Sequence, residues 1–252
     1  MSGEFAGRVV VVTGGSRGIG RAIAAGFAEA GADVVIASRK LENCRAVADE
    51  LDAAHGVRCR PVAYHAGRWD DSDRLADEVL EHYGRCDVLV NNAGMSPLHD
   101  GIAEITEAYF DKVSAVNLKG PFRLSARLGA HMAGAGGGAI INVSTIGSLR
   151  PGASEVVYAC AKAGLNALTI ALAGEFGPTV RVNALLPGAV ETDIAAAWTP
   201  QLRASATADV PLARLGQPAD FVGPALWLAS ARSSFVTGTL IRVDGGAYRQ
   251  TS

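Results

Sequence analysis

The amino-acid sequence predicts a single doubly wound α/β domain, built on a seven-stranded parallel sheet with helices on both faces. Short β-branched runs alternate with longer segments of helical apolar spacing along the whole chain, which is typical of repeated strand–helix units. The strand-like runs are almost entirely apolar, as expected for strands buried on both faces. A glycine-rich segment joins the first strand directly to the first helix. Because no linker-like stretch divides the sequence, we expect one domain over residues 1–252.

Each element is predicted from its own stretch of sequence. Apolar runs predict strands at Val9–Thr13, Asp33–Ser38, 58–65, 86–94, 136–145, 179–188 and 239–246. Helical spacing predicts the intervening helices at 21–32, 41–56, 71–84, 107–132, 156–177 and 219–230. Residues 191–216 break this rhythm with Pro200 and Pro211. A long irregular insertion of this kind predicts a lid over a substrate site.

Composition and charge argue against several classes of protein. Of the 252 residues, 49% are hydrophobic and 19% charged, and the formal net charge is −2. That charge gives no electrostatic footprint for nucleic acid or for an anionic membrane. The four cysteines form no C-x-x-C pair and the histidines form no metal motif, so neither a metal site nor a disulfide framework is predicted. The N-terminal MSGEFAGR resembles no signal peptide, and we expect a cytoplasmic protein.

The segment Thr13–Gly20 has the features of a phosphate-binding loop. Its glycines stand at positions 14, 18 and 20, between the first strand and the first helix. Gly14 permits a tight exit from the strand, while Gly18 and Gly20 let the backbone approach a pyrophosphate at the helix N-terminus. The loop is therefore a predicted cofactor site, with contributions from Gly14, Ser16, Arg17, Gly18, Ile19 and Gly20.

The end of the second strand indicates which nicotinamide cofactor is bound. In NAD-binding proteins an acidic residue about 20 positions beyond the glycines bonds the ribose 2′-hydroxyl. Here Ser38 occupies that place, and Arg39 and Lys40 follow it. A 2′-phosphate would meet these two cations and Arg17, and arginine binds phosphate in bidentate geometry. We therefore predict NADP(H) in preference to NAD(H).

Several further motifs occur in a fixed order along the chain. They are Asn92-Ala93-Gly94 at the end of the fourth predicted strand, Asn117 in VNLKG, Tyr158 and Lys162 in YACAK, and Pro187, Gly188, Val190 and Thr192 in PGAVET. With the glycine loop, these motifs resemble those of the short-chain dehydrogenase/reductase family, and the resemblance covers essentially the whole chain. It implies a Rossmann fold, a nicotinamide cofactor, a small-molecule carbonyl or alcohol substrate, and a homo-oligomer, either tetramer or dimer.

Two positions depart from the family pattern. The family's catalytic serine usually lies 13 positions before the tyrosine, which is Thr145 here, and Ser144 is its neighbour. We favour Thr145, but both hydroxyls remain candidates because neighbouring strand residues point to opposite faces. The family often has an Asp-Val pair near the adenine, where this chain has His65-Ala66. The backbone of Ala66 is then the expected contact, and the variant resembles a carbonyl-reductase-like branch of the family.

Tyr158 and Lys162 are four residues apart in a predicted helix and so share one face. A free tyrosine has a pKa of about 10, and a nearby ammonium lowers that pKa. We predict that Tyr158 donates a proton to the developing alkoxide in reduction and that Lys162 binds the cofactor ribose. The hydroxyl of Thr145 or Ser144 would hold the substrate oxygen. By the resemblance, Asn117 would position a water between Lys162 and solvent, and Pro187, Gly188, Val190 and Thr192 would lie against the nicotinamide.

The sequence leaves the substrate open. A reductase of broad ketone substrates is the leading prediction, with a 3-oxoacyl-thioester reductase and a sugar or steroid alcohol dehydrogenase as alternatives. An acyl-carrier substrate would favour basic residues at the cleft mouth, such as Arg150 and Arg203. The non-enzymatic alternative is a catalytically silent NADP(H)-binding sensor or scaffold. The loops at 96–101, 147–155 and 191–211 are expected to decide specificity.

Overall fold

A parallel β-sheet forms the centre of the protein. The computed structural model describes residues 3–192, 199–208 and 210–248, and over these residues seven strands pair in the order β3-β2-β1-β4-β5-β6-β7. All neighbouring strands pair in parallel, which confirms the predicted sheet. The strands are β1 (Val9–Thr13), β2 (Asp33–Ser38), β3 (Cys59–Ala63), β4 (Val88–Asn91), β5 (Gly138–Val143), β6 (Val180–Pro187) and β7 (Leu240–Val243).

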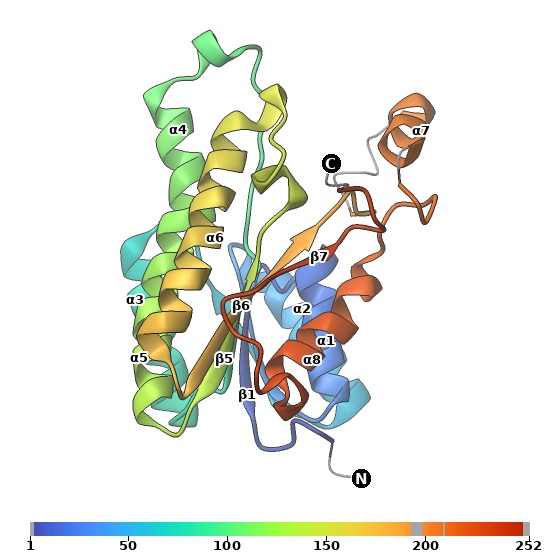
Figure 1. The fold of residues 1–252 in the computed structure, drawn as a ribbon. Coiled ribbons are helices and arrows are strands. Elements are labelled where there is room, and N and C mark those ends of the chain that lie inside the picture. Colours follow the sequence, from blue (N-terminus) through green and yellow to red (C-terminus); the bar gives the residue numbers. More distant parts are fainter. Residues whose placement is uncertain (1–2, 193–198, 209, 249–252) are drawn as a thin grey trace.

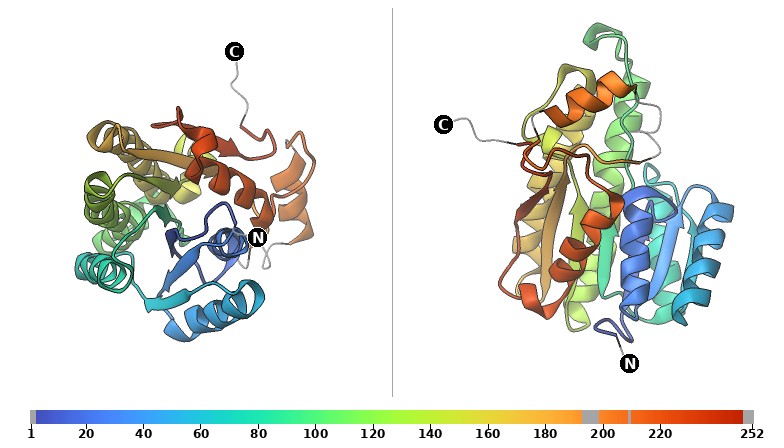
Figure 2. Two further views of the ribbon diagram at one scale, coloured as in Figure 1. Left: turned by 90° about the horizontal axis from the view of Figure 1, so that it is seen from below. Right: turned by 90° about the vertical axis from the view of Figure 1, so that its right-hand side faces the viewer.

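Helices cover both faces of this sheet (Figures 1 and 2). One face carries α1 (Gly18–Glu29), α2 (Leu41–His55) and α8 (Val222–Ala229). The other carries α3 (Trp69–Tyr83), α4 (Glu107–Ser114), α5 (Gly120–Gly134) and α6 (Val156–Phe176). The winding direction reverses between β1 and β4, since the chain first adds β2 and β3 on one side and then β4 to β7 on the other. In open α/β sheets such a switch point is where the carboxyl ends of strands open a crevice for ligands.

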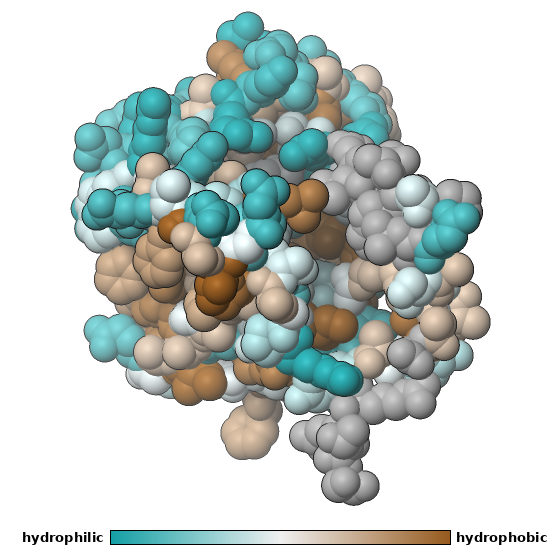
Figure 3. All heavy atoms as spheres, turned by 90° about the horizontal axis from the view of Figure 1, so that it is seen from above, coloured by the Kyte–Doolittle hydropathy of each residue, from teal (hydrophilic) through white to brown (hydrophobic). Residues whose placement is uncertain are grey.

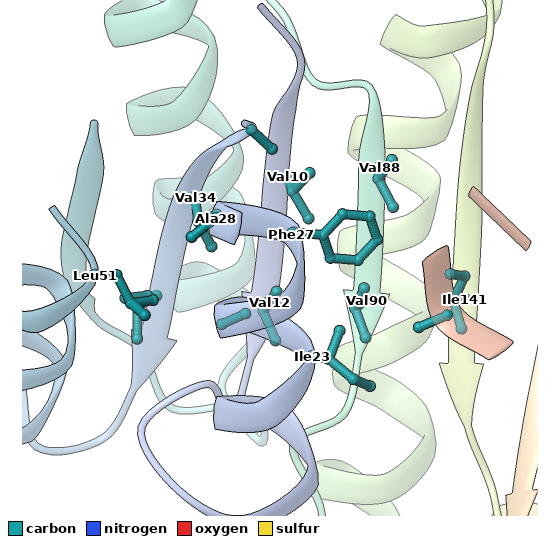
Figure 4. Close-up of a cluster of buried hydrophobic side chains, with 14 of the residues drawn as sticks. Val10, Val12, Ile23, Phe27, Ala28, Val34, Leu51, Val88, Val90 and Ile141 are labelled. Atoms are coloured by element: carbon teal, nitrogen blue, oxygen red, sulfur yellow. The ribbon is translucent and has the colours of Figure 1, made fainter. Parts of the chain in front are cut away.

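The first strand shows why the sheet is covered on both sides. Val10 and Val12 belong to one buried hydrophobic cluster, with Phe27 of α1, while Val9 and Val11 belong to the cluster on the opposite face. This alternation follows from the two-residue period of a strand. Figure 4 shows the first cluster, in which Phe27 and Ile23 lie among the valines of β1 and β4. The four consecutive valines of this strand thus supply side chains to both cores.

The long helix predicted at 107–132 is interrupted in its first half. Helix α4 passes into a π-helical turn at Ala115–Lys119, and α5 follows directly. A π-turn inserts one residue into the helical hydrogen-bond pattern and is frequent at functional sites. The sequence predicted a continuous helix here because apolar spacing does not register a one-residue insertion.

Two other helices bear on the sequence predictions. Within 191–216 the structure has a helix, α7 (Pro200–Ala208), where the sequence indicated an irregular segment; residues 193–198 and 209 of this predicted lid lie outside the described residues. The segment Ala153–Phe176, which contains α6, is long and apolar enough to cross a membrane by length and composition. In the structure, however, α6 packs against β6, α4 and α5, and we interpret it as a core helix.

Candidate active site

The glycine loop brings the start of α1 against the end of β1. Gly14 and Gly18 have φ angles of +65° and +53°, in the region that favours glycine. A β-carbon on Gly20 would stand 2.4 Å from the carbonyl oxygen of Gly14 and 2.3 Å from Asn92 Nδ2. The N-cap residue Arg17 makes no side-chain capping bond, and the first turn holds no acidic residue. The amides of this uncapped turn therefore suit an anion such as a pyrophosphate.

A hydrogen-bonded brace ties this loop to the end of β4. Asn92 Nδ2 donates to the carbonyl oxygens of Thr13 and Gly14, at 3.0 and 3.2 Å. In return, Thr13 Oγ1 accepts from the backbone amides of Asn92 and Ala93 at 3.0 and 3.1 Å. Asn92 thus holds the phosphate loop at the switch point of the sheet.

The predicted 2′-phosphate residues gather at the end of β2. Ser16 Oγ donates to Ser38 Oγ at 3.0 Å, which joins the glycine loop to the strand end. Arg17, Arg39 and Lys40 are exposed. Two hydroxyls and nearby cations therefore occupy the place at which NAD-binding proteins have a carboxylate.

The remaining predicted cofactor residues lie at the same end of the sheet. Ala66 is 6% exposed, and its carbonyl oxygen is 1.8 Å from the point where a β-carbon on Gly120 would stand. Val190 forms a parallel bridge with Gly216. The Cγ2 atom of Thr192 lies 3.5 Å from the corresponding point on Gly18, so the segment after β6 reaches the glycine loop. Pro187 ends β6, and Gly188 follows it against Asp244.

The two candidate hydroxyls at the end of β5 are used differently. The Thr145 hydroxyl lies close enough to the Tyr158 side chain to lower the pKa of its phenol, and Thr145 Oγ1 accepts from the amide of Gly147 at 3.1 Å. Ser144 is buried, and its Oγ donates to the carbonyl oxygen of Lys162 at 3.3 Å. Thr145 is therefore the hydroxyl that faces the tyrosine, while Ser144 joins the strand to α6.

Burial sets the charge states of the tyrosine and lysine. It raises the pKa of Tyr158 to about 12, with a smaller contribution from the negative charge of Glu155, while the Thr145 hydroxyl opposes the shift. Burial lowers the pKa of Lys162 to about 7. The lysine Nζ lies 5.9 Å from the centre of the Tyr158 ring and donates to the carbonyl oxygen of Val143 at 2.7 Å. The phenol is consequently protonated at neutral pH and suited to donate a proton.

Asn117 lies in the π-turn and is fully buried. Its Nδ2 donates to the carbonyl oxygens of Met95 and Val113 at 2.8 and 2.9 Å, and its Oδ1 accepts from the amide of Met95 at 3.2 Å. A β-carbon on Gly94 would stand 3.0 Å from Asn117 Oδ1 and 3.7 Å from Lys162 Nζ. A side chain at position 94 would therefore crowd Asn117 Oδ1, and the predicted water between Asn117 and Lys162 stays a prediction.

The sequence reasoning missed three polar residues of this region. Asn166 Nδ2 donates to Ser148 Oγ at 2.8 Å, and Ser148 Oγ donates to the carbonyl oxygen of Thr145 at 2.5 Å. Asn166 lies four residues beyond Lys162, and that spacing was a usable signal. Glu155, three residues before Tyr158, is partly buried, and burial raises the pKa of its carboxyl group.

Viewed toward the carboxyl ends of the strands, the surface is hollowed, and hydrophobic atoms are visible within the hollow (Figure 3). Among the described residues, no group of three or more histidine, cysteine, aspartate or glutamate side chains could hold a metal ion.

Over nearly its whole length, the chain is similar to known oxidoreductases. Residues 14–248 match a family model described as enoyl-(acyl carrier protein) reductase. The chain is 41% identical over 249 residues to an L-rhamnose 1-dehydrogenase (NAD(P)(+)) from Azotobacter vinelandii, covering 96% of each chain. It is 35% identical over 242 residues to a 3-oxoacyl-[acyl-carrier-protein] reductase from Thermotoga maritima, covering 95% of this chain and 97% of that one.

A solved structure with a similar fold comes from Beutenbergia cavernae. It is provisionally assigned as an NAD(P)-dependent gluconate 5-dehydrogenase and has NADP bound at low occupancy. The TM-score is 0.91 and the sequence identity 39%, with 96% of this chain and 97% of that chain covered.

Proposed function

The chain belongs to the short-chain dehydrogenase/reductase family, an oxidoreductase family that uses a nicotinamide cofactor, and we propose that it interconverts an alcohol and a carbonyl with NADP(H). The observation that carries the proposal is the position of Tyr158 beside both the Thr145 hydroxyl, which lowers the pKa of the phenol, and Lys162, whose Nζ is 5.9 Å from the centre of the tyrosine ring. Acid, hydroxyl and ammonium thereby meet beside a phosphate loop. A silent sensor would not need this arrangement.

In the proposed mechanism, the bound cofactor supplies or accepts the hydride. Thr145 orients the substrate oxygen, and Tyr158 gives its phenolic proton to that oxygen as negative charge develops there. Lys162 binds the cofactor ribose and, when charged, favours the phenolate form of Tyr158 through its positive charge. Asn117 holds the loop at Met95 in place and supports a water next to Lys162.

Replacing Tyr158 by phenylalanine tests the mechanism. We expect a roughly 1,000-fold loss of NADPH-dependent ketone turnover, within the range that a general acid contributes. The Kd for NADPH, measured by fluorescence, should stay within about threefold, because the ring remains. Tyr83→Phe is the matched control, because Tyr83 lies at the end of α3 and its hydroxyl donates a hydrogen bond to the carbonyl oxygen of Arg58. Retained turnover in Tyr158→Phe refutes the assignment. If the wild type binds NADPH but turns over no ketone or alcohol, the result favours the catalytically silent sensor.

The cofactor preference rests on the end of β2. Ser16 and Ser38 form a hydroxyl pair there, and the exposed Arg39 suits a 2′-phosphate through bidentate bonds. We expect Arg39→Ala to lower the ratio of kcat/KM with NADPH to kcat/KM with NADH by roughly 30-fold, because charge-assisted bonds contribute about 1.5–3 kcal/mol. Arg45→Ala, also exposed and on α2, is the control. An unchanged ratio in Arg39→Ala contradicts the NADP(H) assignment.

The substrate class is proposed from both site and relatives. The tyrosine chemistry supports reduction of a ketone or, in reverse, oxidation of a secondary alcohol. A sugar dehydrogenase is favoured as the second candidate by the 41% identity to the L-rhamnose 1-dehydrogenase. A 3-oxoacyl-thioester carried by an acidic carrier protein would favour uncompensated basic residues at the cleft mouth. Arg203, one of the two candidates, forms an ion pair with Glu191 at 2.5 Å, so its charge is compensated.

We also propose that the protein is a homo-oligomer in the cytoplasm. An apolar groove on the face of α4, α5 and α6 supports assembly, with Phe122 43% exposed at its edge. Ala115, Leu118 and Leu168 line the same groove. Light scattering gives the test: a monomeric mass at micromolar concentration contradicts the proposal.

A further inference from the structure

Glu155 occupies the N-cap position of the catalytic helix α6 without capping it. An N-cap side chain ordinarily accepts a hydrogen bond from an amide of the first helical turn, but Glu155 makes no such bond. Its carboxylate lies over the loop after β5 instead. The Oε1 atom is 2.5 Å from the point where a β-carbon on Gly147 would stand, and Thr145 Oγ1 is 3.5 Å from the same point. The carboxylate therefore lies close to the hydroxyl that faces Tyr158.

The surroundings of Glu155 leave its charge uncompensated. Its pKa is raised by burial and lowered only by the backbone amide of Gly152, with no cation among the causes. The same negative charge raises the pKa of Tyr158, three residues further along the chain. Within the described part of the chain, Glu155 is thus neither a helix cap nor a partner in an ion pair. Among the described residues, the Gly152 amide is the one donor that lowers the pKa of this carboxylate, so acceptor sites remain for a ligand.

We propose that Glu155 determines specificity by accepting a hydrogen bond from a substrate hydroxyl close to the reacting carbon, so that the enzyme selects neutral, hydroxyl-rich substrates such as sugars and polyols. This inference rests on the proposed dehydrogenase function and names its substrate class. A carboxylate has only acceptor sites, and a site built to bond a hydroxyl discriminates strongly against an analogue that lacks it. Substrates that carry a carboxylate or phosphate near the reacting carbon are repelled.

The test compares cyclohexanol with its vicinal diol, which differ by one hydroxyl next to the reacting carbon. The readout is the ratio of kcat/KM for the diol to kcat/KM for cyclohexanol, with NADP⁺. We expect the wild type to favour the diol, and Glu155→Leu to lower the ratio roughly 30-fold, because hydrogen bonds to charged groups contribute about 1.5–3 kcal/mol. In Glu155→Gln the ratio should fall by a smaller factor, since an amide oxygen still accepts.

Gly147→Ala provides a second variant that keeps the carboxylate but moves it. The added methyl would stand 2.5 Å from Glu155 Oε1, and the φ of Gly147 lies outside the left-handed region, so the flexible side chain is what must shift. The ratio should fall in this variant as well. Glu175→Leu is the control: it removes the same charge from an exposed position of the same helix, about 30 Å along its axis.

The outcomes separate this inference from the proposed function. The role of Glu155 is overturned if the ratio is unchanged in Glu155→Leu and Gly147→Ala, or if it falls equally in Glu175→Leu. In either case the proposed function still stands as long as turnover depends on Tyr158. A wild type that favours cyclohexanol also overturns the role of Glu155. No turnover of either alcohol, nor of any ketone with NADPH, overturns both. If Glu155→Leu does not fold, Glu155→Gln and Gly147→Ala decide the matter by the same ratio.

Discussion

Replacing Lys162 by methionine should stabilise the folded protein at pH 6 and abolish its turnover. The lysine is 2% exposed, and burial lowers its pKa to about 7. The fold therefore disfavours the charged form of this side chain. Methionine is unbranched, flexible and uncharged, and it fills the same kind of space.

The size of the effect follows from the pKa of Lys162 in the folded and unfolded states. The unfolded lysine keeps its proton up to a pH of about 10.4, whereas the folded one releases it above about 7. Between these values the unfolded state binds more protons, so stability rises with pH across this window. At ~1.4 kcal/mol per pKa unit, the charge penalty is ~5 kcal/mol at pH 6 and ~3 kcal/mol at pH 8.

Methionine removes this penalty but also the hydrogen bond from Nζ to the carbonyl oxygen of Val143, a loss of ~1 kcal/mol. The free energy of unfolding of Lys162→Met should therefore exceed that of the wild type by ~4 kcal/mol at pH 6 and by ~2 kcal/mol at pH 8. Urea unfolding of cofactor-free protein, followed by circular dichroism at both pH values, measures the difference. Lys112→Met, at an exposed position, controls for loss of a surface charge. A difference that is equal at the two pH values, or a less stable variant at pH 6, refutes the reasoning.

Three further predictions concern the same site. Gly20→Ala places a methyl 2.4 Å from the Gly14 carbonyl oxygen, so α1 must shift. The Kd for NADPH, measured by fluorescence titration, should then rise at least ~10-fold, because contacts to the phosphate are lost. An unchanged Kd contradicts the packing argument. Thr145→Val should lower kcat by ~100-fold, as expected for loss of a donor to the substrate oxygen, and Ser144→Ala by much less; the reverse order would assign the substrate hydroxyl to Ser144. With a Tyr158 pKa of about 12, the rate of alcohol oxidation should increase from pH 6 to pH 9, because the phenolate fraction grows. The rate of ketone reduction should not increase, because that direction needs the protonated phenol. An oxidation rate that falls with pH over this range is incompatible with Tyr158 as the base.

Most of the fold could be predicted from the sequence because its signals are local. Uniformly apolar strands such as Val9–Thr13 mark a sheet with two covered faces, and the glycines after it mark the first turn. The π-turn at Ala115–Lys119 gave no such signal, since one extra residue in a helix changes no residue preference. Helix α7 (Pro200–Ala208) was missed because its short apolar stretches lack a clear helical period.

The candidate site was predictable as a set of residues but not as a set of contacts. Position in a motif could not decide between Ser144 and Thr145, because that choice depends on which hydroxyl reaches Tyr158 and which one reaches the backbone of Lys162. Glu155 stands at a helix start, where an acidic residue has an ordinary explanation as a cap. Only the direction of its side chain, toward Gly147, suggests another role.

The way α6 carries the site has a consequence for how substrates can change over evolution. Tyr158 and Lys162 share one rigid helix, so their separation along the axis is set at ~6 Å by the rise per residue. One inserted residue between them would turn the tyrosine by about 100° away from the lysine, and the chemistry would be lost. The loop from Gly147 to Glu155 is under no such constraint, because loops tolerate changes in length and sequence. Lineages of this enzyme can therefore exchange one substrate for another through that loop while inheriting the reaction unchanged.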